Sequence, residues 1–524
     1  MTDHSSSAAW RSLEALAREI RQCTVSQAFR ENPSRERDLS AQAEGLLLDY
    51  SHQRIDARVM DAWASYFDET DLASHTEALF SGAKLNVSED RPALHAALRQ
   101  HSGDRVGGES IEQLVLAERE RMLQFAEEVR ASGRYLTVVN IGIGGSDLGP
   151  ATVVRALRNI GDRAPEVSFV SNVDGHAMSE VLSRVDPATT LFIVCSKTFT
   201  TLETLSNAHR AKDWLVERLG AQAVPQHFVG VSTNGDAMTA FGIPPERQFF
   251  IWDWVGGRFS LWSSIGLVAA IALGRRAFEG LLAGARRMDQ HFRTARWREN
   301  LPALMAALEA WNVNFLGFSA HAVLPYSDRL SLLPFHLQQL EMESNGKSVT
   351  SDGAAVGVET SPVIWGAAAN DAQHSFFQLL HQGSNVSSMD VILPMTPPEG
   401  SVDYDWVLAN AVAQIEAFTM GFDNGEPHKR HEGNRSLSLI LLDRLSPERL
   451  GSLLALYEHK VFVLSRVWQI NPFDQFGVEL GKVIARQVVQ LLGPTSTPEA
   501  LISSDLKSVR ALILQLRAAK DFDR

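Results

Sequence analysis

The segment EMESNGK, residues 341–347, places two glutamates one residue apart and follows them with an Asn-Gly pair, which is typical of a helix end. If the preceding stretch RLSLLPFHLQQ is helical, successive side chains are turned by about 100°. That turn gathers on one apolar stripe Leu332, Leu333, Leu337 and Leu340. Glu343 then lies at the edge of the stripe, one turn after Gln339, whereas Glu341 points nearly the opposite way. A carboxylate at an apolar edge is suited to abstract a proton. We therefore expect Glu343 to be a general base or a structural carboxylate, and Glu341 to be a solvated charge.

Three further side chains could stabilise charge or move protons. Arg258 follows two glycines in DWVGGRFSLWSSIG, an apolar and aromatic neighbourhood. An arginine there is either paired with a carboxylate for structure or aimed at a developing oxyanion. His374 stands at a predicted loop-to-helix junction and is a better acid/base candidate than His381, which a helix C-terminus would hold for structure. Lys482 in NPFDQFGVELGK stands near a predicted helix start, where a lone lysine is usually solvated.

Two turns rich in glycine or hydroxyl groups follow predicted strands. The first, NIGIGGSDLGP, carries Gly142, Gly144, Gly145 and Ser146. The second, CSKTFTTLET, carries Ser196, Lys197, Thr198, Thr200 and Thr201. Glycines let backbone N–H groups approach an anion, and a following helix start adds its dipole. A structural turn in the first segment and helix capping in the second are the alternatives. Taken together, the two turns favour a phosphorylated small molecule.

The sequence lacks several motifs that would indicate other chemistry. Asp147 takes the place of the third glycine of a dinucleotide fingerprint, and no Walker-type G-K-[ST] is present. There is no H-E-x-x-H, no cysteine cluster, no D-x-D-x-D loop and no G-x-S-x-G elbow. We therefore expect neither a metal nor an organic cofactor.

Composition narrows the class of protein. The chain of 524 residues is 45% hydrophobic and 21% charged, which is ordinary for a soluble protein of two or three domains. A net charge of −13 argues against nucleic-acid or anionic-membrane partners. The two cysteines, Cys23 and Cys195, cannot form a disulfide framework and indicate a reducing compartment. The start has no signal-peptide pattern, and the apolar run 265–274 is too short to span a bilayer. We expect a cytoplasmic protein.

Short β-rich runs alternate with helical stretches from about residue 110 onward, after a first hundred residues that we expect to be helical. The predicted strands are RYLTVVNI, VSFVSN, TLFIVC and HFVGVS in a first set, and SAHAVLPYS, SPVIWGA, MDVILPM and SLSLILLD in a second. Residues 449–470 are predicted to form one long helix. This alternation predicts two α/β units in series with parallel, doubly wound sheets. Ligands of such sheets bind beyond the carboxyl ends of the strands, where both turns lie.

Six segments together resemble the glucose-6-phosphate isomerase (phosphoglucose isomerase) family, in the family's order, between residues 140 and 482. They are IGIGGSDLGP, SKTFTTLET, WDWVGGRFSLWSSIG, QQLEMESNGK, QHSFFQLLHQG and NPFDQFGVELGK. The resemblance implies two three-layer αβα domains of the sugar-isomerase (SIS) type with mainly parallel sheets and helical extensions at both ends. It implies a helical segment at 1–105 that packs on the large domain, a first, phosphate-binding SIS domain at 106–280, and a second at 281–524 with a C-terminal helical arm.

The resemblance also implies roles for single residues. Ser196, Lys197, Thr198 and Thr201 would bind the substrate phosphate, with Gly145 and Ser146 lining the same cradle. Gln339 and Gln475 would lie against the sugar, and Glu203 near the histidine. Four residues would be catalytic: Glu343 as the base, Arg258 for the enediolate, and His374 with Lys482 for ring opening.

In the implied reaction glucose 6-phosphate and fructose 6-phosphate interconvert reversibly, as in glycolysis and gluconeogenesis. His374 and Lys482 open the sugar ring, and Glu343 moves a proton between carbons 2 and 1 through a cis-enediolate. Members of the family are homodimers, and the resemblance implies that His374 enters the site from the partner subunit.

Two positions depart from the family pattern. Residues 369–372 read Ala-Asn-Asp-Ala where the family usually has Gly-Thr-Asn-Gly, and this change bears on the loop that carries His374. Phe476 replaces the usual tryptophan, which keeps an aromatic ring and loses an N–H donor.

Two other functions stay open. A phosphosugar-binding regulator would use the same fold without turnover. It would need only the phosphate turns, not the four catalytic residues Glu343, Arg258, His374 and Lys482. A bifunctional glucose/mannose phosphate isomerase belongs to the same broad superfamily, but such chains are shorter and lack GGRFS.

Overall fold

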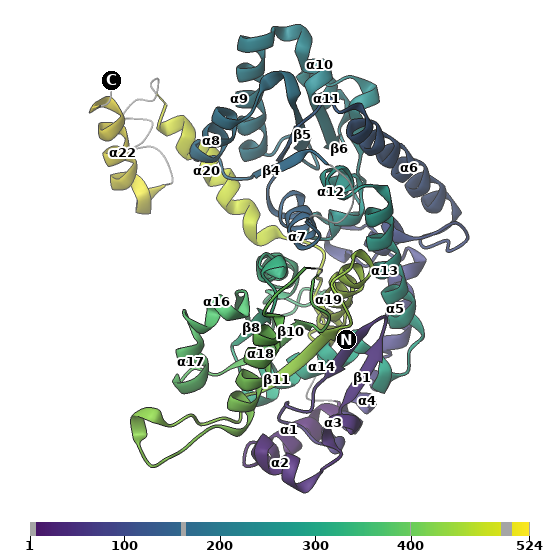
Figure 1. The fold of residues 1–524 in the computed structure, drawn as a ribbon, viewed down its shortest axis with the longest axis vertical. Helices are drawn as coiled ribbons and strands as arrows, with labels where there is room; N and C mark the ends of the chain where they lie inside the picture. Colours follow the sequence, from purple (N-terminus) through teal and green to yellow (C-terminus); the bar gives the residue numbers. More distant parts are fainter. Residues whose placement is uncertain (1–6, 159–163, 399, 494–505, 523–524) are drawn as a thin grey trace. The chain divides into compact units, whose positions relative to one another are not determined.

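The computed structural model describes residues 7–158, 164–398, 400–493 and 506–522 (Figure 1). The outermost residues of both predicted extensions, 1–6 and 523–524, lie outside these ranges. The chain divides into two compact units, residues 1–473 and 474–524, which are described separately below.

The first sheet of residues 1–473 has five parallel strands in the order β4-β3-β5-β6-β7. They are β3 (Thr137–Ile141), β4 (Glu166–Val170), β5 (Thr190–Cys195), β6 (Phe228–Ser232) and β7 (Gln248–Phe250). Its helices are α7 (Leu148–Ala156), α8 (His176–Arg184), α9 (Leu202–Leu219), α10 (Val224–His227) and α11 (Gly235–Phe241). The four strands predicted here are confirmed, and only the three-residue β7 was not anticipated.

This sheet is the middle layer of three. Val139 and Phe192 pack into one core with side chains of α8, α9 and α11. Val138 and Leu191, their neighbours along the strands, pack into the other core with α6 (Glu109–Ser132) and α12 (Leu267–Leu273). Successive side chains of a strand point to opposite faces, so both faces of the sheet are covered by helices.

The second sheet has six strands in the order β1-β2-β11-β10-β8-β9. The parallel strands are β8 (Ala320–Pro325), β9 (Val363–Gly366), β10 (Ser387–Pro394) and β11 (Leu437–Leu442), all predicted from the sequence. One face packs against α16 (Ala369–Gln373), α17 (Phe377–Gln382) and α18 (Tyr404–Met420). The other face packs against α14 (Leu301–Ala310) and α19 (Pro447–Val467). The chain therefore contains two three-layer αβα units with mainly parallel sheets, as predicted.

The first hundred residues are not wholly helical, which corrects the expectation. The helices are α1 (Ala8–Ile20), α2 (Val25–Glu31), α3 (Arg35–Asp38), α4 (Ala57–Glu69) and α5 (Leu72–Ser81). Between them β1 (Ser40–Ala43) and β2 (Leu46–Asp49) form a hairpin, and β2 pairs antiparallel with β11. The two strands read SAQA and LLLD and lack the β-branched and aromatic residues that mark a strand in a sequence. The hairpin covers the edge of a sheet formed far along the chain.

The long helix α19 packs against the second sheet and is itself covered by another long helix. The helix predicted over residues 449–470 is α19, which packs along α13 (Arg275–Thr294) (Figure 1). Nearly every side chain of α19 is buried, including Glu458, His459 and Lys460. A helix buried all round belongs to the core of a large protein, so its charged residues must find partners inside.

The unit of residues 474–524 is helical in its described part. It contains α20 (Glu479–Leu491) and α22 (Arg510–Phe522), with a short 3₁₀ turn, η15 (Phe476–Val478), before α20. Lys482 lies in the first turn of α20, where its ammonium bonds Glu479 at 2.9 Å and both side chains are exposed.

Candidate active site

Glu343 and Arg258 form an ion pair. The Nη1 of Arg258 donates a hydrogen bond of 2.8 Å to Oε1 of Glu343, and Nε2 of Gln339 donates one of 3.2 Å to Oε2. The side chain of Arg258 is fully buried, whereas 26% of the Glu343 side chain is exposed. The carboxylate is therefore the member of the pair that a ligand can reach.

Further hydrogen bonds fix the guanidinium of Arg258 in one place. Its Nε donates to Oγ of Ser344 at 2.6 Å, and its Nη2 donates to the backbone oxygen of Pro472. Arg258 lies on η8 (Gly257–Trp262). The ring centroid of the next residue, Phe259, lies 5.4 Å from Cζ of the guanidinium. A cation held so rigidly needs no reorganisation to stabilise negative charge that develops beside it.

Glu341 is buried, so the expectation that it would be a solvated charge is wrong. Its Oε2 accepts a hydrogen bond of 3.1 Å from Nζ of Lys460, and its exposed fraction is 1%. The chain from Gln338 to Glu343 is a π-helical segment, η13, that follows α15 (Leu333–Leu337). A π-helix bonds residue i to i+5, so its turns are wider than those of an α-helix. The side-chain directions predicted from a turn of about 100° per residue are therefore wrong after Leu337.

Lys460 and a second carboxylate, Glu309, were missed by the sequence reasoning. Both are buried and ion-paired. The available signal was a charge inside an apolar run: Glu309 in ALMAALEAW, and Lys460 close to Glu458 in ALYEHKVFVL. Such charges are almost never buried without a partner.

The glycine-rich turn after β3 lies directly against the Arg258 segment. A β-carbon on Gly145 would stand only 1.9 Å from the backbone oxygen of Gly257, and one on Gly144 would stand 2.9 Å from Nε2 of Gln339. The turn η4 (Gly144–Ser146) therefore approaches both Gln339 and the GGRFS segment as only glycine allows. The tertiary structure brings Gly145, Ser146, Gln339, Arg258 and Glu343 together.

The hydroxyl-rich turn after β5 is joined to the same region. A β-carbon on Gly142 would stand 3.3 Å from that of Cys195, at the neighbouring strand end. Nζ of Lys197 donates to the backbone oxygens of Asp253 and Val255, at 2.8 and 2.9 Å, in the loop that leads to Arg258. Burial lowers the pKa of Lys197 to about 8.

Thr201 does not cap α9 with its side chain, so that alternative fails. It occupies the N-cap position without a side-chain capping bond, and its hydroxyl accepts from Oγ of Ser196 at 3.0 Å. The hydroxyls of Thr198 and Thr200 share a bond of 2.6 Å. Hydroxyls gathered at the start of a long helix suit a phosphate group, and Glu203 lies in the first turn of α9.

The remaining predicted site residues lie apart from this group in the chain. His374 is an exposed residue at the C-terminal end of α16, not at a helix start. Gln475 and Lys482 belong to the unit of residues 474–524.

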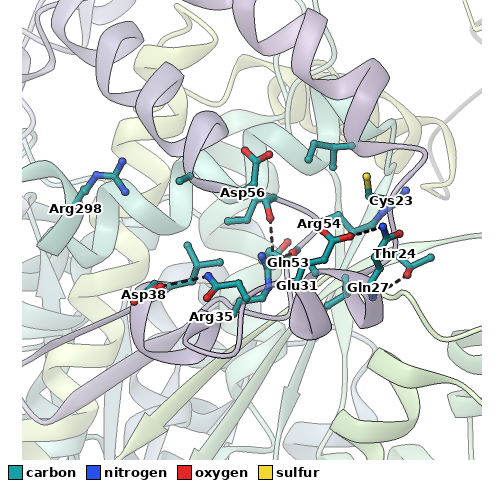
Figure 2. Close-up of a pocket in the computed structure, with 17 residues that line it drawn as sticks. Cys23, Thr24, Gln27, Glu31, Arg35, Asp38, Gln53, Arg54, Asp56 and Arg298 are labelled. Atoms are coloured by element: carbon teal, nitrogen blue, oxygen red, sulfur yellow. Dashed lines mark hydrogen bonds between the residues drawn. The ribbon is translucent and has the colours of Figure 1, made fainter.

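A separate cavity of about 410 Å³ lies among α2, α3 and the segment before α4 (Figure 2). Figure 2 shows hydrogen bonds among the residues that line it, as from Gln27 to Glu31. Arg35 donates to the backbone oxygens of Ser51, Gln53 and Ile55, and Asp56 caps α4. None of the predicted site residues lines this cavity.

The described ranges contain neither a cluster of metal-binding side chains nor a membrane-spanning helix. Within them no three His, Cys, Asp or Glu side chains stand close enough together to hold a metal ion. No helix in those ranges combines the length and the apolar character needed to cross a membrane.

Known proteins resemble this chain over nearly its whole length. The family described as phosphoglucose isomerase matches residues 49–513. A glucose-6-phosphate isomerase of Gloeobacter violaceus is 45% identical over 98% of this chain and 97% of its own. One of Cupriavidus metallidurans is 46% identical over 93% of this chain and 95% of its own. The crystal structure of a glucose-6-phosphate isomerase from Chlamydia trachomatis superposes with a TM-score of 0.88 at 35% identity, covering 98% of this chain and 100% of that one.

Proposed function

Because this chain belongs to the phosphoglucose isomerase family, we propose that it interconverts D-glucose 6-phosphate and D-fructose 6-phosphate with Glu343 as the proton-transfer base. The chain is an aldose-ketose isomerase with sugar-isomerase domains, and its reaction serves glycolysis and gluconeogenesis. The observation that carries the assignment of the base is the unequal burial of the Arg258–Glu343 pair.

That geometry suits proton transfer through a cis-enediolate. Glu343 takes the proton from carbon 2 and returns it to carbon 1, which requires a carboxylate that reaches the substrate. Negative charge grows on the sugar oxygens during this step. Arg258, fixed by Ser344 and Pro472, supplies a preorganised positive charge beside it.

The two turns at the ends of β3 and β5 form the phosphate cradle in this proposal. Hydroxyl groups come from Ser196, Thr198 and Thr201, and Gly145 and Ser146 line the opposite side. The start of α9 adds backbone N–H groups and its dipole. Because the ammonium of Lys197 bonds two backbone oxygens, Lys197 contributes charge and a backbone N–H rather than a side-chain hydrogen bond.

Ring opening is assigned to His374 and Lys482, with Gln339 and Gln475 against the sugar and Glu203 near the histidine. A proton moves from the anomeric hydroxyl to the ring oxygen, and an imidazole can both accept a proton and donate one. The exposed position of His374 supports a role toward a ligand or a second subunit rather than in the core.

A homodimer that shares His374 across its interface is part of the proposal. The outward face of α18 carries apolar side chains: Trp406, Ala409, Val412, Ala413 and Met420. Trp406 is 70% exposed and Val412 62% exposed. A surface of this kind is unusual on a monomer and is typical of an interface between subunits.

The compartment and the domain limits are proposals as well. Both cysteines are free, which agrees with a cytoplasmic protein. The five-stranded sheet falls within 106–280, and the parallel strands of the other sheet fall within 281–524. The N-terminal segment 1–105 then contributes the edge hairpin to the second domain.

A coupled assay tests the function. Fructose 6-phosphate is supplied, and the glucose 6-phosphate formed is oxidised by an auxiliary dehydrogenase whose nicotinamide product is measured. We expect turnover by the natural chain and a loss of at least about a hundredfold in kcat for Glu343→Gln. A folded sample that binds sugar phosphate without turnover would instead support the regulator. Comparable turnover of mannose 6-phosphate would support the bifunctional isomerase.

A further inference from the structure

A buried ionic cluster lies behind the segment that carries Glu343. Lys460 on α19 contacts Oε2 of Glu309 on α14 and Oε2 of Glu341 on η13, the latter at 3.1 Å. The three side chains are at most 2% exposed. Charges removed from water to this degree are strongly destabilising unless their partners are well placed, so the cluster favours one fixed arrangement of its three elements.

One proton balances the cluster, which has two carboxyl groups and one ammonium. Burial, followed by the nearby Glu341 charge, raises the pKa of Glu309 well above its ordinary value. Burial alone would raise the pKa of Glu341 too, but Lys460 and the hydrogen bond from Glu309 outweigh it and lower that pKa. These opposite directions favour the proton on Glu309 and leave Glu341 as the carboxylate that accepts from Lys460.

Further polar groups complete the surroundings of Lys460. Asp390 on β10 accepts from the hydroxyl of Tyr457 at 2.8 Å and contacts Nε2 of His321 at 3.2 Å. Burial lowers the pKa of Lys460, but the nearby carboxyl groups of Glu309, Glu341 and Asp390 outweigh that effect and raise this pKa above its ordinary value. The anchor for Glu341 is thus a buried ammonium that is charged at neutral pH.

Glu341 and Glu343 stand two residues apart on the same π-helical segment, but their side chains contact different parts of the protein. Glu341 is tied to α14 and α19, while Glu343 meets Arg258. The residues that follow are tied down as well. Asn345 donates to the backbone oxygen of Val461, and Lys347 donates to those of Glu343 and Ser344. Glu341 is the side-chain anchor on the N-terminal side of Glu343, and π-helical segments of this kind occur frequently at functional sites.

We propose that Glu341, held by Lys460 and Glu309, is a positioning residue that fixes the π-helical register of residues 338–343 and thereby the place of the Glu343 carboxylate. The proposal rests on the function proposed for Glu343. It assigns to Glu341 no contact with substrate. Its effect is on the step in which the base must meet carbon 2, where a misplacement of about 1 Å can cost about a hundredfold in rate.

Three substitutions separate this role from ordinary core stability. Glu341→Ala removes the anchor and leaves Lys460 in contact with Glu309. Without the Glu341 charge beside it, Glu309 can lose its proton and become the counter-charge of Lys460. Glu341→Gln keeps an oxygen that accepts from Lys460 and should rescue the anchor. Leu215→Ala is the matched control, because Leu215 is fully buried near the C-terminal end of α9, in a different core cluster. Each variant is measured for Tm, kcat and KM at a temperature where it is folded.

We expect kcat of Glu341→Ala to fall about ten- to a hundredfold with KM within about twofold of the natural chain. Glu341→Gln should retain kcat within about threefold, and Leu215→Ala should lower Tm while keeping kcat. A purely structural Glu341 would make Glu341→Ala resemble Leu215→Ala, and that result would overturn the proposal. Equal losses of kcat in Glu341→Ala and Glu341→Gln would overturn it as well.

Glu343→Gln, measured beside these variants, tells the two possible failures apart. If Glu343→Gln is inactive while Glu341→Ala keeps full kcat, the base is correct and the positioning role is wrong. If Glu343→Gln retains full kcat, the proposed function of Glu343 itself is wrong.

Discussion

Arg258 and Glu343 divide one ion pair between the core and the substrate side. Burying the arginine costs desolvation energy, and a partly exposed carboxylate returns less of that energy than a buried one would. The pair is therefore a weak arrangement if it serves stability alone. Here Ser344 and Pro472 accept two further hydrogen bonds from the arginine. Glu343 can therefore exchange its contact for one with substrate without stranding the guanidinium.

Asp147 is a second carboxyl group whose surroundings disfavour its charge. It follows the glycine-rich turn, and its Oδ1 is buried without a hydrogen-bond partner in the described part of the chain. Burial raises the pKa of Asp147 from an ordinary 3.8 to about 6. Its contribution to stability is fully present below about pH 3.8 and is lost as the pH rises through 6, because the folded state then binds the proton more tightly than the unfolded state.

Asp147→Asn should therefore stabilise the protein at neutral pH and not in acid. The shift corresponds to about 3 kcal/mol of unfolding free energy at pH 7.5. We expect a Tm gain of a few degrees at pH 7.5 that shrinks toward pH 4.5, measured by calorimetry at one scan rate. A gain of the same size at both pH values would show that the charge of Asp147 is not its cause.

At the scale of single elements, the glycine-rich turn and the GGRFS segment act as one unit. Gly145 stands so close to the backbone of Gly257 that the two turns can meet only without a side chain there. The contact places the proposed phosphate cradle at a fixed distance from Arg258. Positions of substrate and charge are then set by backbone rather than by flexible side chains.

Gly145→Ala should separate these two turns. A β-carbon 1.9 Å from the Gly257 oxygen forces one backbone to move. We expect kcat/KM for fructose 6-phosphate to fall at least about tenfold, with a lower Tm. Gly357→Ala is the control, because nothing lies within 4 Å of the β-carbon it would add. If Gly145→Ala has the same kcat/KM as the natural chain, the contact does not position the site.

At the scale of the whole molecule, the proposed dimer makes two predictions. The apolar face of α18 should be covered by a second copy, so Trp406→Asp should give monomers in analytical ultracentrifugation. The control is Leu114→Asp on α6, an exposed apolar residue on another helix. Dimers that persist in Trp406→Asp would place the interface elsewhere.

Sharing of His374 across the interface can be tested by mixing two inactive variants. Unfolding and refolding His374→Ala together with Glu343→Gln yields half mixed dimers, each with one of its two sites intact. About a quarter of the natural activity should return on the cyclic substrate. His374→Ala alone should keep more activity on an open-chain substrate than on the cyclic sugar. No recovery in the mixture would place His374 and Glu343 of one site on the same subunit.

The sequence by itself determined the eight longer parallel strands, the long helix α19 and the family. Continuous apolar runs such as TLFIVC can be satisfied only in a covered parallel strand, and the six segments have spacing and order of their own. It also singled out Glu343 rather than Glu341 as the candidate base, although by a helical phase that does not continue beyond Leu337.

Only the tertiary structure decided what surrounds those residues. The hairpin of β1 and β2 exists because a sheet edge from residues 437–442 needs cover. Glu341 is buried because Lys460, more than a hundred residues later, draws it inward through a π-helical turn. Local periodicity cannot report such partners, since the energy of a buried charge depends on groups brought near it only by folding.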